Sequence, residues 1–313
     1  MRSDSSSPTM LVTGAGGFVG AAVVRAAHAA GIAVHASGRT GAPERLSDCP
    51  VPYHPLDLTD GEAVDTLLET VRPDIVIHPA WAGVSGAARA SDVQFASITA
   101  TCRLADAAIR CGARKFVGVG SQAEYGPLDG PVAESRVPMP STLYGAAKLS
   151  ACHLSRQRCQ DAGLDFAWLR LFATYGPGDN PNWLIPSLIA RMAAGESPKM
   201  TPGTQKWDYL FNEDTAAGIL ATALSDARGI LNLSSGSSVP VRDIAVMIRD
   251  RVAPGLDLIF GEVPFSPSQI MHMEGDIAAL RDATGWVPRV SLAEGLDRTV
   301  AAHASHEARK ALA

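Results

Sequence analysis

The chain has 313 residues, of which 46% are hydrophobic and 19% are charged, and its formal net charge at pH 7 is -5. That length can fold as one large α/β domain with a smaller appendage or as two domains. The mild excess of acidic residues argues against nucleic acid or an anionic membrane surface as the partner.

Sequence features of several other protein classes are missing. Arg25, His28 and Pro79 interrupt the longest apolar runs, so none reaches the roughly 20 residues that a membrane span needs. Residues 1–8 are polar and serine-rich, which indicates a loose tail and not a secretory signal. The five cysteines form no Cys-x-x-Cys pair, which disfavours a disulfide framework and a zinc site. We expect a cytoplasmic protein without a bound metal.

The first predicted strand, residues 10–12, leads through a glycine-rich turn into a helix predicted over residues 21–30. Gly14, Gly17 and Gly20 recur in this turn at a spacing of three. Without a Cβ, these residues permit a tight turn, a close approach of the backbone to a pyrophosphate, and close packing of the helix on the strand. The free N–H groups and the positive dipole end of the helix attract phosphate. The turn therefore predicts a dinucleotide site.

The end of the second predicted strand bears on which dinucleotide is bound. This strand covers residues 32–36 and is followed by Ser37, Gly38 and Arg39. An acidic residue at this point would hydrogen-bond the ribose 2′-hydroxyl of NAD, whereas an arginine accommodates the 2′-phosphate of NADP. We therefore expect NADP(H) to be preferred and NAD(H) to be possible. The alternative is that Arg39 is a solvated loop charge.

Strands and helices go on alternating along the chain. Residues 56–60 close a third short strand, and Thr59 or Asp60 caps a helix predicted over residues 63–71. The next predicted elements are a strand over 73–78, a helix over 93–111 and a strand over 115–119. Apolar strands alternating with helices are typical of a parallel sheet that is covered on both faces. In such a sheet, ligands bind outside the carboxyl ends of the strands.

Polar residues suited to proton transfer follow the last of these strands. Ser121 comes just after it, and Tyr144 and Lys148 stand at the beginning of the next predicted helix. A spacing of four places tyrosine and lysine on one helical face. An ammonium close to a phenol favours the ionised phenol and lowers its pKa, which suits general acid/base catalysis.

These motifs together resemble the extended short-chain dehydrogenase/reductase family, in its nucleotide-sugar epimerase, dehydratase and 4-ketoreductase branch. Further matches are Tyr125-Gly126, residues 170–172, residues 175–179 and residues 285–288. The resemblance covers nearly the whole chain and implies a Rossmann-type doubly wound parallel sheet of class α/β with a smaller C-terminal substrate-binding lobe. On this basis we divide the chain into a tail (1–8), a dinucleotide-binding domain (9–177, to which 207–233 returns) and an interleaved smaller lobe (178–206 and 234–313).

The resemblance also implies roles for individual residues. Tyr144 would be the general acid/base, Lys148 would bind the nicotinamide ribose, and Ser121 would hydrogen-bond the reacting oxygen. The other cofactor-binding residues would be Gly14, Gly16, Gly17, Phe18, Val19, Arg39, Asp57, Leu58, Ala80 and Ala82. The substrate-binding residues would be Ser121, Gln122, Tyr144, Asn180, Asn182 and Trp207. The implied partner is a nucleoside-diphosphate sugar, and a homodimer would form through the helices at 93–111 and 144–159.

Departures from the family pattern narrow the expected reaction. Dehydratases of this branch carry an aspartate and a glutamate directly after the catalytic serine or threonine, where this chain has Gln122 and Ala123. Glu124 follows one place later, and in an extended segment it would face the other way. GDP-fucose-type epimerase-reductases use a cysteine and a histidine at the positions of Ala123 and Gly178. Neither pair of acid/base residues is present here.

Three functions remain open after these departures. The first is NADPH-dependent reduction of the C4 ketone of a 4-keto-6-deoxy nucleotide sugar, which Arg39 favours. The second is C4 epimerisation with bound NAD, and the third is a catalytically weak cofactor-binding regulator. The diphosphate end of the substrate site is unusual, because Trp207 stands where the family carries an arginine. Lys206, Arg191 or His272 could substitute for it.

Overall fold

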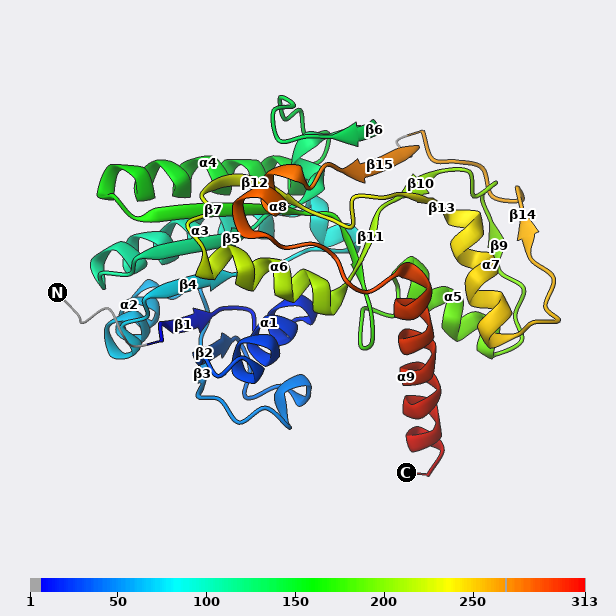
Figure 1. The fold of residues 1–313 in the computed structure, drawn as a ribbon, viewed down its shortest axis with the longest axis horizontal. Coiled ribbons are helices and arrows are strands. Elements are labelled where there is room, and N and C mark those ends of the chain that lie inside the picture. The colour runs from blue at the N-terminus through cyan, green and yellow to red at the C-terminus, as the bar shows by residue number, and fades with distance from the viewer. Residues whose placement is uncertain (1–6, 268, 313) are drawn as a thin grey trace.

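The computed structural model describes residues 7–267 and 269–312, of which 307–312 by their backbone alone. The larger part of the described chain is a sheet with helices on both faces, and a smaller part packs beside it (Figure 1). The loose tail expected over residues 1–8 lies outside the described residues as far as residue 6, and the first strand begins at Thr9.

Seven parallel strands form the main sheet, in the order β12-β7-β5-β4-β1-β2-β3. They cover Gly229–Leu233 (β12), Asp165–Leu171 (β7), Lys115–Val119 (β5), Ile75–His78 (β4), Thr9–Val12 (β1), Ala33–Gly38 (β2) and Tyr53–Pro55 (β3). The inner strands β4 and β5 are buried along their whole length, because helices cover both faces. The first strand, β1, lies inside the sheet between β4 and β2, and the strand order reverses beside it, which is the Rossmann-type arrangement. The predicted fold class is confirmed.

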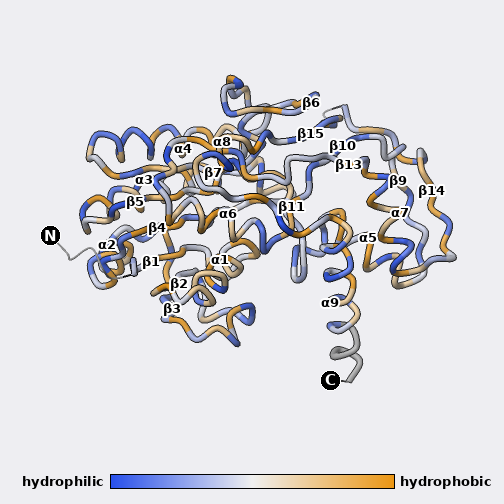
Figure 2. Tube along the Cα trace, viewed as in Figure 1, coloured by the Kyte–Doolittle hydropathy of each residue, from blue (hydrophilic) through white to orange (hydrophobic). Residues whose placement is uncertain are grey.

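Helices cover the main sheet in two layers. The helices α1 (Phe18–Ala29), α6 (Asn212–Leu224) and α8 (Ala278–Thr284) pack on one face, and α2 (Gly61–Val71), α3 (Val93–Arg110) and α4 (Leu143–Ala162) pack on the other. Figure 2 shows hydrophobic residues along the central strands and an alternation of hydrophobic and hydrophilic residues along helices such as α4. The buried residues of α4 recur three or four positions apart, which is typical of a helix with one buried side.

The smaller part contains short strands and three helices around an apolar core of its own. A four-stranded sheet has the order β13-β10-β15-β6, and β9 pairs with β14 and β8 with β11. These strands cover Asp129–Val132 (β6), Ala173–Tyr175 (β8), Lys199–Met200 (β9), Lys206–Trp207 (β10), Tyr209–Phe211 (β11), Val239–Pro240 (β13), Ile259–Phe260 (β14) and His272–Gly275 (β15). The helices are α5 (Leu184–Ala193), α7 (Val241–Val252) and α9 (Leu292–Leu312). From β10 the chain runs through β11 and α6 to β12, at the edge of the main sheet.

Three short 3₁₀ helices follow strands of the main sheet. They are η1 (Glu44–Leu46) after β2, η2 (Gly86–Ala90) after β4 and η3 (Gln122–Tyr125) after β5. Because they follow the carboxyl ends of their strands, they contribute to the edge of the sheet where a ligand is expected.

Two predicted boundaries differ from the structure. The helix α1 begins at Phe18, earlier than predicted, inside the glycine-rich turn. The third strand lies at Tyr53–Pro55, and residues 56–60 form the turn after it. In that turn Asp60 caps α2 by accepting a hydrogen bond from the Ala63 N–H at 3.1 Å. The strand therefore ends earlier than its apolar pattern suggests.

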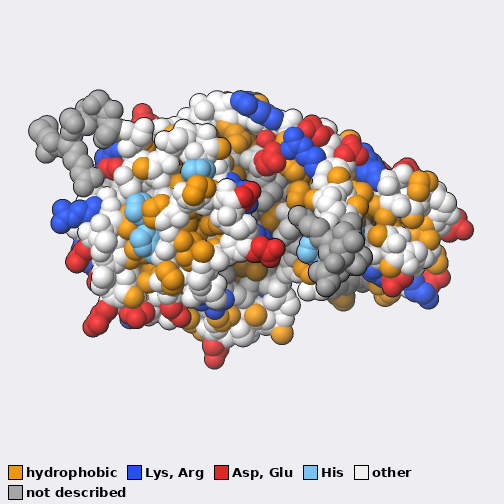
Figure 3. Space-filling view, turned by 90° about the horizontal axis from the view of Figure 1, so that it is seen from below, with side chains coloured by type: hydrophobic (Ala, Val, Ile, Leu, Met, Phe, Trp, Pro, Cys, Tyr) orange, Lys and Arg blue, Asp and Glu red, His pale blue; other side chains and the backbone are white. Residues whose placement is uncertain are grey.

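Within the described part of the chain, no helix combines the length and the apolar character that crossing a bilayer requires. The face of the molecule seen in Figure 3 carries acidic and basic side chains interspersed with hydrophobic ones.

Candidate active site

One cavity of about 1270 Å³ brings together most of the predicted site residues. Its walls come from the carboxyl ends of β1, β2, β4 and β5 with the connections that follow them, and from the smaller part of the molecule. Parallel strands end at one edge of the sheet, so segments that are distant in the sequence meet there. All of the predicted cofactor-binding residues line this cavity.

The glycine-rich turn forms a cradle that a larger residue would fill. Gly14 has a left-handed φ of +62°, and a Cβ there would lie 2.7 Å from Ala80 Cα, just after β4. A Cβ on Gly20 would lie 2.2 Å from the Gly14 carbonyl oxygen, so only glycine lets α1 pack this closely on the turn. Gly17 is the N-cap of α1, and no side chain caps this helix. The residues of the turn therefore suit the pyrophosphate of a dinucleotide.

The cavity continues to Arg39, Asp57 and Leu58, where the adenosine end of a dinucleotide was predicted. The Arg39 side chain is exposed at this end. Sequence analysis missed Tyr53, whose hydroxyl is buried and finds no partner in the described part of the chain. A Cβ on Gly38 would lie 2.5 Å from that hydroxyl, so the glycine leaves room for the phenol.

Arg45 links the glycine-rich turn to the smaller part of the molecule. Its Nη1 donates to the Gly16 carbonyl at 3.3 Å, and its Nη2 donates to the Gly178 carbonyl at 2.6 Å. The side chain of Arg25 supports this bridge by donating to the Arg45 carbonyl at 2.8 Å. The connection after β2 and the loop after β8 are thereby held together beside the cradle.

His78 joins three elements below the cavity. Its Nδ1 lies 2.8 Å from Thr13 Oγ1 at the end of β1, and its Nε2 lies 3.0 Å from Thr101 Oγ1 on α3. Burial lowers the pKa of His78 to about 3, so the ring is neutral at neutral pH. Its role is to hold the strand ends that carry the cradle.

Tyr144 and Ser121 lie close together in the wall of the cavity. Tyr144 stands at the beginning of α4, where Thr142 caps the helix by accepting a backbone N–H at 3.1 Å. The side chains are nearly buried, with 7% of Tyr144 and 9% of Ser121 exposed. Burial raises the pKa of the Tyr144 phenol, whereas the Ser121 hydroxyl and the Arg89 guanidinium lower it.

The effect of Lys148 on the pKa of Tyr144 stays a prediction, although burial raises the pKa of this phenol. Lys148 Nζ donates to the Val119 carbonyl at 2.6 Å and lies 4.0 Å from the centre of the Trp81 ring. Burial lowers the pKa of Lys148 itself to about 7. The cation that covers the phenol is Arg89, whose Cζ lies 4.0 Å from the centre of the Tyr144 ring.

Glu124 is kept out of the cavity for a different reason than predicted. Residues 122–125 form the 3₁₀ helix η3 and not an extended segment. The buried Glu124 carboxylate accepts from Arg170 Nε, Trp168 Nε1 and the Ser121 N–H, each at 2.9 Å. The carboxylate therefore fixes the position of Ser121 and does not replace the missing acid/base pair.

Five of the six predicted substrate-binding residues line the cavity, namely Ser121, Gln122, Tyr144, Asn180 and Trp207. Asn182 does not, because its side chain is exposed in a local turn in which its N–H donates to Asn180 Oδ1 at 3.0 Å. Gln122 Oε1, Gln205 Oε1 and Trp207 Nε1 are buried without a partner among the described residues. These atoms are available to hydroxyl, amide or carbonyl groups of a ligand.

The basic residues considered as substitutes for the family's arginine lie outside the cavity wall. Lys206 is exposed, Arg191 is paired with Glu196 at 3.0 Å, and His272 is paired with Glu274 at 3.0 Å. The first residues of α5 do line the cavity, and no side chain caps this helix. The uncapped backbone N–H groups at the beginning of α5 therefore add to the donors that the cavity offers to a diphosphate.

Sequence analysis also missed Asp179 and Arg89. Asp179 lines the cavity, its Oδ1 accepts from the Asn180 N–H at 2.7 Å, and burial raises its pKa to about 6. Arg89 belongs to η2 and reaches Tyr144 from another segment of the chain. Asp179 ends the segment 175–179 that matches the family pattern, although no role was given to this residue. Arg89 stands in no such motif.

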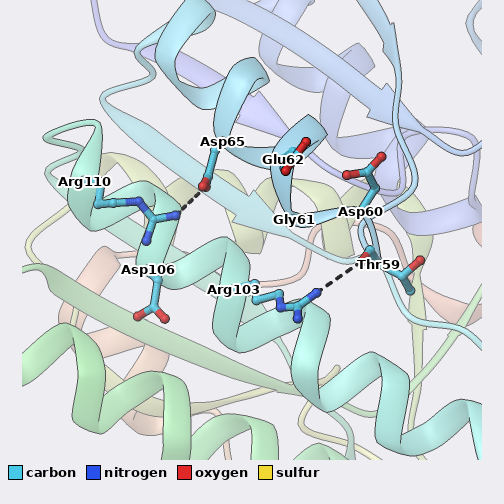
Figure 4. A pocket seen from close by; sticks show the side chains of 8 residues that line it. All are labelled: Thr59, Asp60, Gly61, Glu62, Asp65, Arg103, Asp106 and Arg110. Atoms are coloured by element: carbon cyan, nitrogen blue, oxygen red, sulfur yellow. Dashed lines mark hydrogen bonds and ion pairs between the residues drawn. The ribbon is translucent and has the colours of Figure 1, made fainter.

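A smaller groove of about 520 Å³ lies between α2 and α3, away from the cradle (Figure 4). Its charged side chains are largely engaged with one another or with the backbone. Arg110 pairs with Asp65, and Arg103 donates to the Thr59 carbonyl at 3.2 Å. We assign no function to this groove.

The chain is similar to known enzymes over most of its length. Residues 10–233 match the NAD dependent epimerase/dehydratase family. A UDP-glucuronate 4-epimerase of Thermodesulfobacterium geofontis is 29% identical over 252 residues, which are 79% of this chain and 78% of that protein. A dTDP-glucose 4,6-dehydratase of Streptomyces griseus is 29% identical over 95% of this chain and 94% of that protein.

A solved structure shows the same arrangement of elements. The UDP-glucose 4-epimerase of Thermus thermophilus, in complex with NAD, superposes with a TM-score of 0.84 at 25% identity, over 94% of this chain and 98% of that one. The span that matches the family contains the cradle, Ser121, Tyr144 and Lys148. The chain therefore belongs to the NAD-dependent epimerase/dehydratase family, the extended short-chain dehydrogenase/reductase enzymes that act on nucleotide sugars.

Proposed function

We propose that the protein is a 4-ketoreductase, which uses NADPH to reduce the C4 ketone of a nucleoside-diphosphate 4-keto-6-deoxy sugar. One observation carries the proposal. The described part of the cavity wall holds Ser121, Tyr144 and Lys148, and at the positions of the dehydratase acid/base pair the chain has Gln122 and Ala123. One proton donor is enough for ketone reduction, whereas dehydration needs a second acid and base.

The side chains of the cavity suit the chemistry of reduction. The dinucleotide, held by the cradle and by Lys148, would supply a hydride to C4. Ser121 would donate a hydrogen bond to the ketone oxygen, and Tyr144 would donate its proton to the alkoxide that develops there. Burial raises the pKa of Tyr144, so the phenol carries its proton at neutral pH, as a donor must.

NADPH is proposed as the preferred reductant because of Arg39. It follows β2, where a residue that selects NAD would be acidic, and it lines the end of the cavity beyond the cradle. Arg39→Ala is expected to raise the KM for NADPH about tenfold through loss of a charge-assisted phosphate contact, and to leave the KM for NADH within about twofold. Steady-state kinetics with both cofactors measures this. Equal changes in the two KM values would remove Arg39 from cofactor selection.

The second candidate is a C4 epimerase that retains NAD through the catalytic cycle. Two observations favour it: similar proteins are 4-epimerases, one of them solved with NAD, and the Arg45 bridge ties the cradle to the smaller part. Denaturing the purified protein and assaying the released dinucleotide separates the two. An epimerase would release about one NAD per chain and consume no NADPH, whereas a ketoreductase would oxidise added NADPH in proportion to the ketone.

We also propose a homodimer formed through the outer sides of α3 and α4. The two helices pack against each other on the same face of the sheet, and each carries a large exposed apolar side chain, Phe95 and Leu154 respectively. Sedimentation velocity would then give the mass of two chains. A single-chain mass at micromolar concentration would exclude this dimer.

A further inference from the structure

Arg45 lies at the rim of the cavity. Its side chain is exposed to solvent and also belongs to the cavity wall. Its Nη1 donates to the Gly16 carbonyl at 3.3 Å, and its Nη2 donates to the Gly178 carbonyl at 2.6 Å. Gly16 lines the cavity, and Gly178 directly precedes Asp179, which lines it as well. These two hydrogen bonds, the Arg45 bridge, therefore join two segments of the wall at the rim.

One end of the bridge is anchored. Arg45 belongs to η1, which contacts α1, the helix that begins at the glycine-rich turn. Leu46, the next residue, is buried in the same apolar core as the inner side of α1. Arg25 of α1 donates to the Arg45 carbonyl at 2.8 Å and pairs with Asp48. The backbone that carries Arg45 is thus fixed with respect to the turn.

The other end of the bridge is loosely packed. Gly178 is exposed and has a left-handed φ of +79°, which glycine adopts without strain. Apart from its chain neighbours, the only described atom within 4 Å of a Cβ placed on Gly178 is Arg45 Nε, at 3.9 Å. A segment with so few contacts opens at a low cost in free energy. The loop after β8 can therefore leave the turn once its hydrogen bond to Arg45 breaks.

We propose that the Arg45 bridge is a gate on the dinucleotide site, which must open whenever a dinucleotide enters or leaves. The turn that it holds is the cradle for the pyrophosphate, where α1 begins without a side-chain cap. Both acceptors are backbone carbonyls of the protein, so the bridge forms with or without a bound dinucleotide. Arg45 acts on the loop and not on a reacting atom, and is thus a positioning residue. The inference needs the dinucleotide site, which both candidate functions share, and not the reduction itself.

A gate of this kind changes the rates of binding and not its equilibrium. Entry and release pass the same barrier, so loss of the bridge lowers the barrier for both by the same amount. The dissociation constant then stays the same, because the bridge is present in the free and in the bound protein. A side chain that contacted the dinucleotide itself would stabilise the bound state alone, and its loss would raise the dissociation constant.

Both rate constants can be measured without a sugar substrate. The protein is mixed by stopped flow with NADPH, and in a second series with NADH, and nicotinamide fluorescence gives the association rate constant. Displacement by an excess of the oxidised dinucleotide gives the dissociation rate constant, and calorimetry gives the dissociation constant. Arg45→Gln removes the charge-assisted hydrogen bonds, so it should raise both rate constants about tenfold and keep the dissociation constant within about threefold.

Two further variants separate the bridge from its charge. Arg45→Lys keeps the charge and loses the forked donors, so it should raise both rate constants by at least about fivefold. Arg251→Gln is the matched control, because Arg251 also donates to two backbone carbonyls, those of Met247 at 2.9 Å and Ala293 at 3.3 Å. None of these three residues lines the cavity. The control should therefore keep both rate constants within about twofold of the wild-type values.

Several results would overturn the proposal. Wild-type rate constants in Arg45→Gln would show that the bridge is no barrier. A raised dissociation constant with an unchanged association rate constant would make Arg45 a ligand of the dinucleotide. Wild-type rate constants in Arg45→Lys would assign the effect to the charge, and this variant decides alone if circular dichroism shows that Arg45→Gln does not fold. A wild-type release slower than turnover would reject the proposed reduction and leave the gate in place, since a reductase must exchange its dinucleotide in each cycle.

Discussion

Burial dominates the chemistry of the individual residues in the cavity. It raises the pKa of the Tyr144 phenol, lowers that of Lys148 to about 7 and raises that of Asp179 to about 6. In each case the neutral form is favoured, because a charge is poorly solvated in the wall. Neighbouring groups offset part of these shifts. The Ser121 hydroxyl and the Arg89 guanidinium lower the pKa of Tyr144, and the Asn180 N–H lowers that of Asp179.

The phenol of Tyr144 is the residue on which turnover should depend most. Tyr144→Phe removes the proton donor and leaves the ring that fills the wall, so it should lower kcat by about 10²–10⁴-fold and leave the dissociation constant of NADPH within about threefold. Single-turnover kinetics and calorimetric titration of the cofactor measure the two quantities. Unchanged turnover would show that another group supplies the proton.

Asp179 should make stability depend on pH. Its pKa in the folded chain, about 6, lies above the ordinary value of 3.8. Such a carboxyl contributes stability below its unfolded pKa and loses that contribution as pH rises through the folded pKa. Asp179→Asn keeps the acceptor for the Asn180 N–H and removes the charge. It should therefore raise the free energy of unfolding by about 2 kcal/mol at pH 7, with no gain at about pH 4. Urea denaturation at both pH values tests this, and a loss of stability at pH 7 would contradict it.

At the scale of elements, the 3₁₀ helix η3 positions the Ser121 hydroxyl. Ser121 is its N-cap, and the Glu124 side chain accepts the Ser121 N–H in a capping box. The same carboxylate is paired with Arg170 in β7, and both groups are buried. The conformation of this turn thus depends on an ion pair that anchors it to the sheet.

The variant Glu124→Gln tests how much the ion pair with Arg170 stabilises the fold. It removes one partner of a buried ion pair and leaves Arg170 charged in the interior, so it should lower the free energy of unfolding by about 3–5 kcal/mol. Glu262→Gln is the control, because Glu262 pairs with Lys199 at 2.8 Å on the surface and its loss should change stability by no more than about 1 kcal/mol. Urea unfolding of both variants is the measurement. If Glu124→Gln lowered the free energy of unfolding as little as Glu262→Gln does, the buried ion pair would not anchor the turn.

The order of the elements could be predicted from the sequence, but some of their boundaries could not. Alternation of apolar strands and helices, with glycines at a spacing of three, was enough for the sheet, the cradle and their order. The errors at β3 and around Glu124 fell where side chains end an element through local hydrogen bonds, whereas α1 begins early without a side-chain cap. Asp57 accepts the Thr59 N–H and hydroxyl after β3, and Glu124 closes η3 after β5. Hydrophobic periodicity carries no information on such bonds.

At the scale of the whole molecule, the cavity depends on two parts of the chain that alternate in sequence. Residues after β8 and in β10 line the cavity together with the cradle, and Arg45 links the cradle to the loop after β8. Spacing within one helix predicted that Tyr144 and Lys148 share a face. It could not predict Arg89 over the phenol, since that contact arises only when the connection after β4 meets α4 in the folded chain.

The most direct test of the proposed function is the fate of a labelled hydride. The protein is incubated with a nucleoside-diphosphate 4-keto-6-deoxy sugar and NADPH that carries deuterium at the transferred position of its nicotinamide ring, and the product is analysed by mass spectrometry and NMR. A 4-ketoreductase should place one deuterium at C4 and oxidise one NADPH per sugar, and Tyr144→Phe should abolish both changes. A C4-inverted nucleotide sugar formed without deuterium and without loss of NADPH would contradict the proposed reduction.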